Sequence, residues 1–224
     1  MNTIKFHNEH LSQTKVVNNI LRVYTKATKE DLNKDWYKEA FEFSVSVVSD
    51  FDWKVSPTQV VGIVAALSPM CQWKRNKELT ISFLTNYFDG CWQNTKCLGA
   101  SKQKAYQIAS LSNINRDDTD LICAILSGAK TSAFFDNIYN YRDSKLVTID
   151  RHALSISLGF KLSQEHFRNY KMTDNHYAFF SKCYSVAAKK MECSPLKMQG
   201  VTWVVLRRDH KEALNNSKNL LNLV

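Results

Sequence analysis

An amine and a carboxylate stand near the starts of two successive expected helices. Lys130 lies in residues 127–131 (SGAKT), where a Ser-Gly turn precedes an apolar helix. Asp150 opens the next helix, in residues 148–152 (TIDRH). A partly desolvated lysine amine can attack carbon as a nucleophile. A carboxylate at a helix N-terminus tends to stay ionised and can stabilise positive charge that develops on a substrate.

The composition indicates a helical protein with a polyanionic partner. With 224 residues and 44% hydrophobic content, the chain can bury a sizeable core. Six glycines and three prolines leave few turns, which favours long helices over a many-stranded sandwich. A formal net charge of +9 favours partners such as nucleic acids, whose phosphates would supply much of the affinity.

The cysteines and apolar runs argue against several classes of protein. The six cysteines form no C-x-x-C pair and no cysteine–histidine cluster, so we expect no zinc, iron–sulfur or other metal site. In the absence of a secretory signal, we expect reduced, mostly buried thiols and a monomeric cytoplasmic protein. The longest apolar run, Val60 to Leu67, is too short to cross a bilayer, so we expect no membrane partner.

Helical periodicity and helix-start signals predict an all-α chain. Residues 1–55 are expected to form two amphipathic helices separated by a polar break at residues 25–31. Ser56 and Pro57 predict the N-cap and first turn of an apolar helix that ends near Leu67. Further helices are expected at about 73–87, 102–111, 117–126, 130–139, 150–159, 173–192 and 195–209, followed by a tail that frays.

The order of these motifs resembles the helix-hairpin-helix DNA glycosylases of the endonuclease III superfamily. The Ser127-Gly128 turn is similar to the family's hairpin, and residues 150–159 (DRHALSISLG) are similar to its Asp-Thr-His stretch and later Leu-Gly. Residues 64–68 (VAALS) resemble an early Leu-Ser segment, and residues 101–111 resemble a Lys-Ala helix before the hairpin.

The resemblance implies a single two-lobed helical domain that spans residues 1–224. Residues 57–160 would form the hairpin-containing core. Residues 1–56 and 161–224 would be packing helices that form the second lobe. The iron–sulfur loop of some relatives is absent from this sequence.

The resemblance also assigns roles to individual residues. Lys130 and Asp150 would be catalytic and would act on the bond between base and sugar. Backbone and side chains at Ser127, Gly128 and Thr131 would bind a DNA phosphate. The further expected DNA contacts are Lys102 and Lys104. No organic cofactor is implied, although a monovalent cation at the hairpin fits the family.

Four other residues are candidate contacts to a flipped base. Gln72, Trp73 and Asn76 have the spacing to share a helical face, where two amides beside an indole could read and stack a base. A helix start with a core tryptophan and capping polar groups explains the same pattern. His152 lies close to Asp150 in sequence, and a structural hydrogen-bonding role is its alternative.

The chain departs from the family pattern in three places. Residues 125–128 read Ile-Leu-Ser-Gly instead of Leu-Pro-Gly-x-Gly, residues 139–149 contain neither glycine nor proline, and residues 67–70 read Leu-Ser-Pro-Met instead of Leu-Ser-Ala-Gln. The pattern Ser-Pro-x-x-x-Trp-x-x-Asn, with Gly-x-Lys, Asp-Arg-His and a late Gln-x-x-x-Trp, resembles an often phage-encoded branch, whose members would act in the host cytoplasm. The expected function is a DNA N-glycosylase, with or without strand cleavage at the resulting abasic site. A non-catalytic DNA-binding module and an enzyme of hypermodified-base metabolism on the same fold are the alternatives.

Overall fold

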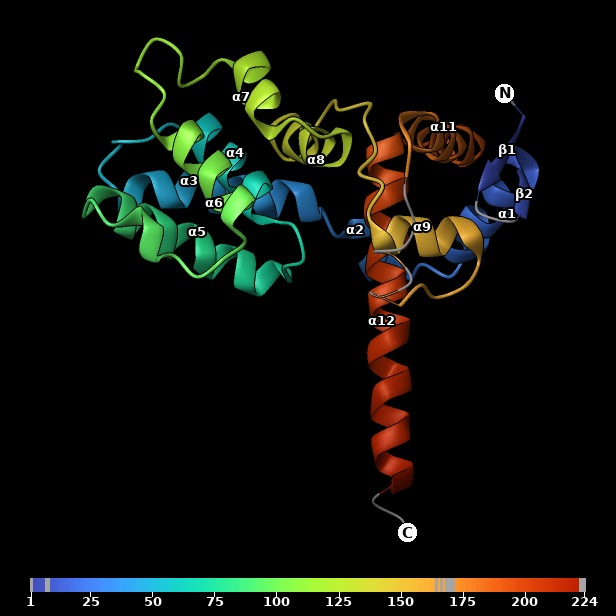
Figure 1. Cartoon of the computed structure of the whole chain (residues 1–224). Helices are drawn as coiled ribbons and strands as arrows, with labels where there is room; N and C mark the ends of the chain where they lie inside the picture. The colour runs from blue at the N-terminus through green and yellow to red at the C-terminus, as the bar shows by residue number, and fades with distance from the viewer. Residues whose placement is uncertain (1, 7–8, 164, 166, 168–171, 222–224) are drawn as a thin grey trace. The chain divides into compact units, whose positions relative to one another are not determined.

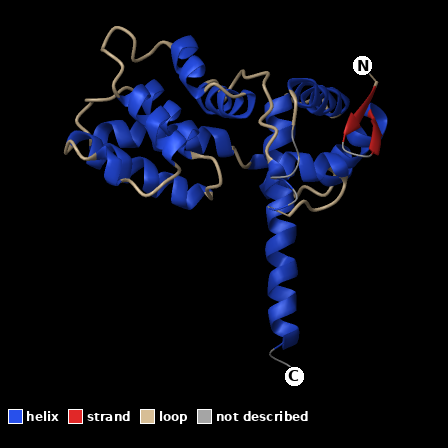
Figure 2. Ribbon diagram, viewed as in Figure 1, coloured by secondary structure: helices blue, strands red, loops and turns tan. Residues whose placement is uncertain are grey.

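A computed structural model shows a protein built almost entirely from α-helices. It describes residues 2–6, 9–163, 165, 167 and 172–221. The expected all-α class is confirmed, apart from one short pair of strands (Figures 1 and 2). In chain order, the elements are β1 (Thr3–Phe6), β2 (Glu9–Ser12), α1 (Gln13–Tyr24), α2 (Lys29–Asn33), α3 (Trp36–Asp50), α4 (Pro57–Leu67), α5 (Trp73–Phe88), the 3-10 helix η1 (Trp92–Asn94), α6 (Gly99–Ala109), α7 (Thr119–Leu126), α8 (Ala129–Tyr139), α9 (Arg151–Leu158), α11 (Asp174–Lys190) and α12 (Pro195–Leu221).

The chain forms two compact units. One is the continuous segment 36–144, and the other combines residues 1–35 with residues 145–224. These bounds differ from the expected core of 57–160. Helix α3 packs on α4 and α8 inside the first unit, whereas α9 packs on α1 and α12 inside the second.

Helix α4 is the centre of the unit formed by residues 36–144. It contacts α3, α5, α6, α7 and α8, and its residues from Thr58 to Leu67 are all buried (Figure 1). The expected start at Ser56 and Pro57 is confirmed, because Ser56 and Gln59 form a reciprocal capping box. The Gln59 Nε2 also donates to the Ile108 carbonyl at 3.0 Å, which ties α4 to α6.

The N-terminal segment of the other unit corrects one expectation. Residues 3–6 and 9–12 form an antiparallel two-stranded sheet instead of the first turns of an amphipathic helix (Figure 2). Ile4 and Phe6 are buried while Thr3 and Lys5 are exposed, which is the period-two alternation of a strand. The expected pair of helices before residue 55 is instead three helices, and a Thr28–Asp31 capping box starts the short α2.

The core of this second unit lies between α1, α9, α11 and α12. Tyr184 of α11 is fully buried and its hydroxyl donates to the Ala153 carbonyl of α9 at 3.2 Å. Gly159 ends α9 where the sequence predicted, and it adopts the left-handed conformation with φ 81°. Helix α12 continues to Leu221 instead of ending near residue 209.

The helix lengths and the cysteine thiols bear on two further expectations. Among the described helices, none combines the length and apolar character needed to span a membrane. All six cysteines are free thiols, but only Cys183 is buried and the others are half-buried. The expectation of mostly buried thiols is therefore wrong. Four of the half-buried cysteines lie in connections between helices, where packing covers a side chain only in part: Cys71, Cys91, Cys97 and Cys193.

Candidate functional site

Helices α7 and α8 are joined by a connection of two residues, Ser127 and Gly128. Ser127 caps the C-terminus of α7 in the left-handed conformation, with φ 51°. This conformation favours glycine and costs a serine on the order of 1 kcal/mol. The Thr131 hydroxyl donates back to the Gly128 carbonyl at 3.0 Å and to the Leu126 carbonyl at 3.3 Å. Thr131 therefore closes the turn instead of presenting its hydroxyl outward.

The first turn of α8 is open to an anion. Gly128 is the N-cap and offers no side chain to accept from the first-turn amides. The first amide that bonds within the helix is that of Ser132, which donates to the Gly128 carbonyl at 2.9 Å. Unbonded amides at a helix N-terminus form a binding site for phosphate. Lys130 lies half-buried in this same turn.

Both lysines expected to contact DNA instead bond to carbonyl oxygens of this unit. Lys104 Nζ donates to the Leu126 carbonyl at 2.5 Å and to Ser127 Oγ at 2.8 Å. Lys102 Nζ donates to the Gln93 carbonyl at 2.5 Å. The expected DNA contacts of Lys102 and Lys104 stay predictions, and in the structure both ammonium groups already have partners within the protein. Lys104 acts as a cationic cap on α7, where a positive charge is favourable.

The Lys104 ammonium also bears on the monovalent cation implied by resemblance. Such a cation would need carbonyl oxygens at the end of α7 and in the turn. The Leu126 carbonyl already accepts bonds from Lys104 and Thr131, and the Gly128 carbonyl accepts from Thr131 and Ser132. These oxygens do not fit an added cation, because a tethered ammonium supplies the positive charge.

Asp150 lies in the other unit, at the N-terminus of α9. It is half-buried, and its Oδ1 accepts from the Ala153 amide at 2.7 Å. The expected N-cap is therefore confirmed. The hydroxyl of Tyr177 in α11 holds the preceding backbone, because it donates to the Val147 carbonyl at 2.8 Å and lies 3.2 Å from the Ile149 amide. Burial raises the Tyr177 pKa to about 12, so this anchor stays protonated.

His152 belongs to a group of side chains from α9 and α12. Its ring meets that of Trp203 edge-on at 6.5 Å between centroids, and the Arg207 guanidinium lies over the Trp203 ring at 4.8 Å. Burial lowers the His152 pKa; the Asp150 charge opposes this, and the charges of Arg151 and Arg207 add to it. The imidazole is therefore neutral near pH 7, in a group that also holds a carboxylate and a stacked guanidinium.

The three residues expected to share one helical face at the start of α5 are separated. Gln72 is the exposed N-cap of α5. Asn76 is 2% exposed and its Nδ2 donates to the Val64 carbonyl at 3.1 Å, so it fastens α5 to α4. Trp73 packs edge-on against Trp36 and Phe43, at 4.9 and 5.7 Å between ring centroids. These contacts favour the alternative in which Asn76 and Trp73 have packing and hydrogen-bonding roles over the one in which they contact a base.

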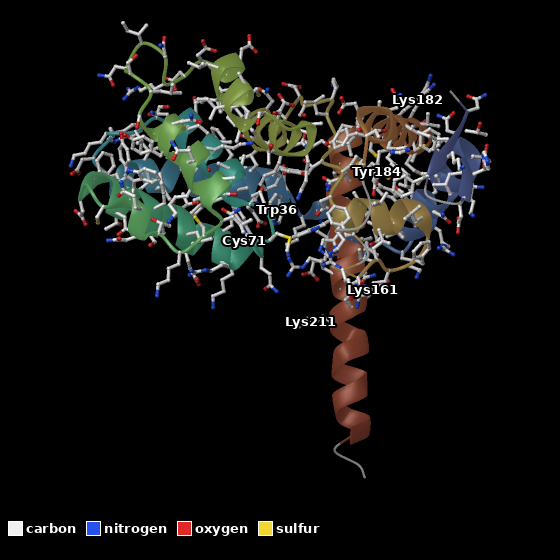
Figure 3. The ribbon with its side chains drawn as sticks, viewed as in Figure 1. Trp36, Cys71, Lys161, Lys182, Tyr184 and Lys211 are labelled. Atoms are coloured by element: carbon white, nitrogen blue, oxygen red, sulfur yellow. The ribbon has the colours of Figure 1, made fainter. Side chains whose placement is uncertain are left out.

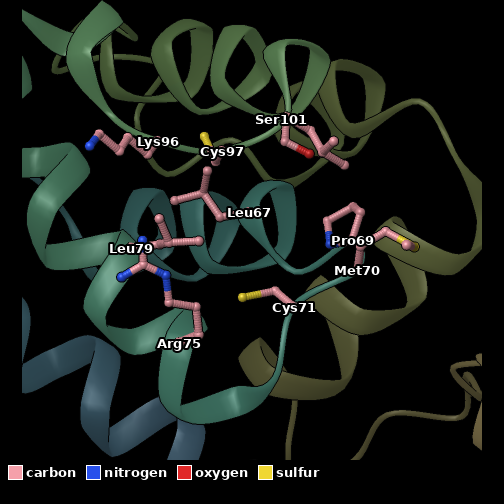
Figure 4. A pocket seen from close by; sticks show the side chains of 10 residues that line it. Leu67, Pro69, Met70, Cys71, Arg75, Leu79, Lys96, Cys97 and Ser101 are labelled. Atoms are coloured by element: carbon pink, nitrogen blue, oxygen red, sulfur yellow. The ribbon is translucent and has the colours of Figure 1, made fainter.

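A hollow of about 550 Å³ opens beside the C-terminus of α4. Figure 4 shows Cys71 and Arg75 on one side and Lys96, Cys97 and Ser101 on the other. Burial raises the pKa of both thiols, and the Arg75 charge opposes this. Cys71 and Cys97 are therefore protonated at neutral pH, which makes them poor nucleophiles. The full lining is Leu67, Pro69, Met70, Cys71, Arg75, Leu79, Lys96, Cys97, Leu98 and Ser101.

The structure groups the candidate residues by unit. Ser127, Gly128, Lys130 and Thr131 lie together with the Lys104 ammonium in the unit formed by residues 36–144. Asp150 and His152 belong to the other unit.

The sequence interpretation missed part of the surroundings of Asp150. Tyr177 carried no sequence signal, because its partners lie 28 and 30 positions away. Trp203 and Arg207 could have been found together, since residues four apart on a helix share a face.

The comparisons with known proteins give a family and no activity. The chain matches a family described as a family of unknown function, DUF7178, over residues 2–210. Neither the curated proteins nor the solved structures contain a match. The family match includes the two-residue connection at Ser127 and the N-cap at Asp150. Since it spans both units, the chain belongs to the DUF7178 family.

Proposed function

We propose that this protein is a DNA N-glycosylase that releases a base from a nucleotide flipped out of DNA. One observation carries the proposal. A two-residue connection with open first-turn amides at α8 is followed, in chain order, by a half-buried carboxylate that caps the next helix. The chain thus has an anion-binding helix start followed by a carboxylate that could stabilise positive charge on a sugar. The helix-hairpin-helix glycosylases have these two elements in the same order.

The proposed role of Asp150 follows from the charge change in the reaction. As the bond between C1′ and the base breaks, the base leaves with the bonding electron pair and positive charge builds on the sugar ring. A fixed carboxylate stabilises that charge without having to reorganise. The Ala153 amide and the Tyr177 anchor keep the Asp150 carboxylate and its backbone in one position.

The proposed role of Lys130 is that of the amine nucleophile. Its Nζ would form a bond to C1′ as the base leaves, and opening of the sugar would give a Schiff base. Strand cleavage would then follow by elimination of the phosphate. In the alternative mechanism, water is the nucleophile and Lys130 only positions the substrate.

The test is incubation of the protein with DNA duplexes that each carry one damaged or modified base, with and without borohydride. Base release by the wild-type protein is the expected result. Borohydride reduces a Schiff base to a stable amine, so a covalent protein–DNA adduct identifies the amine pathway. An abasic-site duplex tests strand cleavage separately.

The other outcomes identify the alternatives. Tight DNA binding with no released base and no adduct would make the protein a binding module. Activity confined to hypermodified pyrimidines, in DNA or as free nucleotides, would place it in hypermodified-base metabolism. Either result overturns the proposal that the protein releases a damaged or modified base from duplex DNA.

A further inference from the structure

A group of basic side chains surrounds the exposed side of α9 and α12 in the unit that contains Asp150. Arg151 comes from the first turn of α9, Lys161 from the segment after α9, and Arg207 and His210 from α12. Figure 3 shows Lys161 beside α12, on which Lys211 also lies. Residues from three separate parts of the chain thus present positive charge together.

Two hydrogen bonds hold the Lys161 segment in this position. Arg151 Nη1 donates to the Leu162 carbonyl at 2.9 Å, and the Leu162 amide donates to Ser155 Oγ at 3.1 Å. Arg207 is held differently, since its guanidinium stacks on the Trp203 ring. The Lys161 segment is therefore placed by contacts with α9, and Arg207 by a contact within α12.

In the part of the chain that the structure describes, Arg151, Lys161 and Arg207 form no ion pair with a carboxylate. The neighbouring Arg208 provides the contrast, because it is paired with the buried Asp31 and with Asp209. The acidic groups beside these cations are Asp150 at the start of α9 and Asp209 of α12, and Asp209 is already paired with Lys26 and Arg208.

We propose that Arg151, Lys161, Arg207 and His210 form a binding site for a backbone phosphate of DNA. Arg207 is exposed and its planar guanidinium stacks on a ring, which suits the paired oxygens of a phosphate, and a lysine adds a point charge. The site lies on the same unit as Asp150 and would hold the strand beside the nucleotide on which Asp150 acts. In that respect it rests on the proposed function, but phosphate binding itself does not need the chemistry.

The two histidines make this site sensitive to pH. Burial lowers the His210 pKa, the charges of Lys161 and Arg151 add to this, and Asp209 opposes it. His152 is shifted in the same direction by burial and by Arg151, Arg207 and His210, against Asp150. A bound phosphate offsets these cations and favours the protonated histidines, so binding should strengthen as the pH falls toward about 6.

The test compares the DNA affinity of full-length variants over a range of salt concentrations. The double variant Lys161→Gln/Arg207→Gln should bind a short undamaged duplex more weakly than the wild type. The slope of log affinity against log salt should fall by roughly 0.9 for each phosphate that the variant no longer neutralises. Lys182→Gln/Lys189→Gln on α11 removes the same charge from exposed positions of the same unit and should match the wild type. His210→Gln should flatten the rise in affinity at low pH.

Each outcome separates this site from the proposed reaction. An unchanged salt slope in the Lys161→Gln/Arg207→Gln protein, or an equal loss in the Lys182→Gln/Lys189→Gln protein, overturns the site. A second experiment measures the melting temperature with and without inorganic phosphate. If phosphate stabilises the wild type but not Lys161→Gln/Arg207→Gln, while the two proteins bind DNA with equal affinity, the site binds free phosphate. That result also overturns the proposal. Base release is measured in parallel. If the wild type releases no base and the double variant still shows a smaller salt slope, the glycosylase proposal is refuted and the phosphate-site proposal is supported.

Discussion

The ammonium of Lys104 lies 2.5 Å from the carbonyl oxygen of Leu126 and closes the C-terminal end of α7. The same ammonium donates to Ser127 Oγ and so supports a serine in the left-handed conformation. A cation at this end of a helix interacts favourably with the helix dipole and with the unpaired carbonyl groups. One side chain from α6 thus stabilises the turn that precedes the open first-turn amides of α8.

Replacing Lys104 by alanine should lower the free energy of unfolding by about 1 kcal/mol, the scale of a charged hydrogen bond at a helix end. The variant should also become sensitive to the kind of salt, because a potassium ion can take the place of the ammonium. Thermal unfolding in potassium chloride and in tetramethylammonium chloride at equal ionic strength measures both effects. Lys102→Ala, which loses only the bond to Gln93, should show no such difference, and a difference of equal size there would contradict the assignment.

Asp150→Asn should lower base release by at least about a hundredfold, the scale of one preorganised electrostatic contact. Folding should be retained, because asparagine is as good an N-cap as aspartate, whereas Asp150→Ala should cost about 1 kcal/mol of stability. Single-turnover base release and thermal unfolding provide the two measurements. Asp118→Asn makes the same change at the N-cap of α7 and serves as the matched control. Wild-type activity in the Asp150→Asn protein would refute the mechanism.

Lys130→Ala should abolish the borohydride-trapped adduct while leaving the fold intact, since alanine is favourable in a helix. If base release is lost as well, Lys130 is the primary nucleophile. If base release continues, Lys130 acts only in strand cleavage and water releases the base. Gel analysis of the adduct and of free base distinguishes these results, and Lys182→Ala on α11 is the control. An adduct that survives in Lys130→Ala places the nucleophile elsewhere.

Stability should fall as the pH is lowered from about 7 toward about 5. Burial holds the His152 pKa below its ordinary value of 6.5, so the unfolded chain binds a proton in this range that the folded chain does not. The contribution is fully present above pH 6.5 and is lost progressively as the pH falls below it. His152→Gln should show a shallower decline of melting temperature over this range than the wild type. A slope unchanged by the substitution would show that His152 is not the group responsible.

The sequence by itself determined the features that depend on residues three or four positions apart. The N-cap at Ser56, the N-cap at Asp150 and the helix end at Gly159 were all predicted, because each helix signal acts within one turn. The all-α class followed from the apolar periodicity in the same way.

The tertiary structure decided which polar groups are free to act. Asn76 was a reasonable base contact from its spacing, and packing of α5 on α4 turned it into a buried donor. Lys104 donates to Leu126 and Ser127, which lie 22 and 23 positions away in the sequence, so no local pattern could predict these bonds. The basic group around Arg207 exists because the Lys161 segment folds back onto α9 and α12 packs on α9. Such contacts depend on how helices pack, and the order of residues along one helix does not encode them.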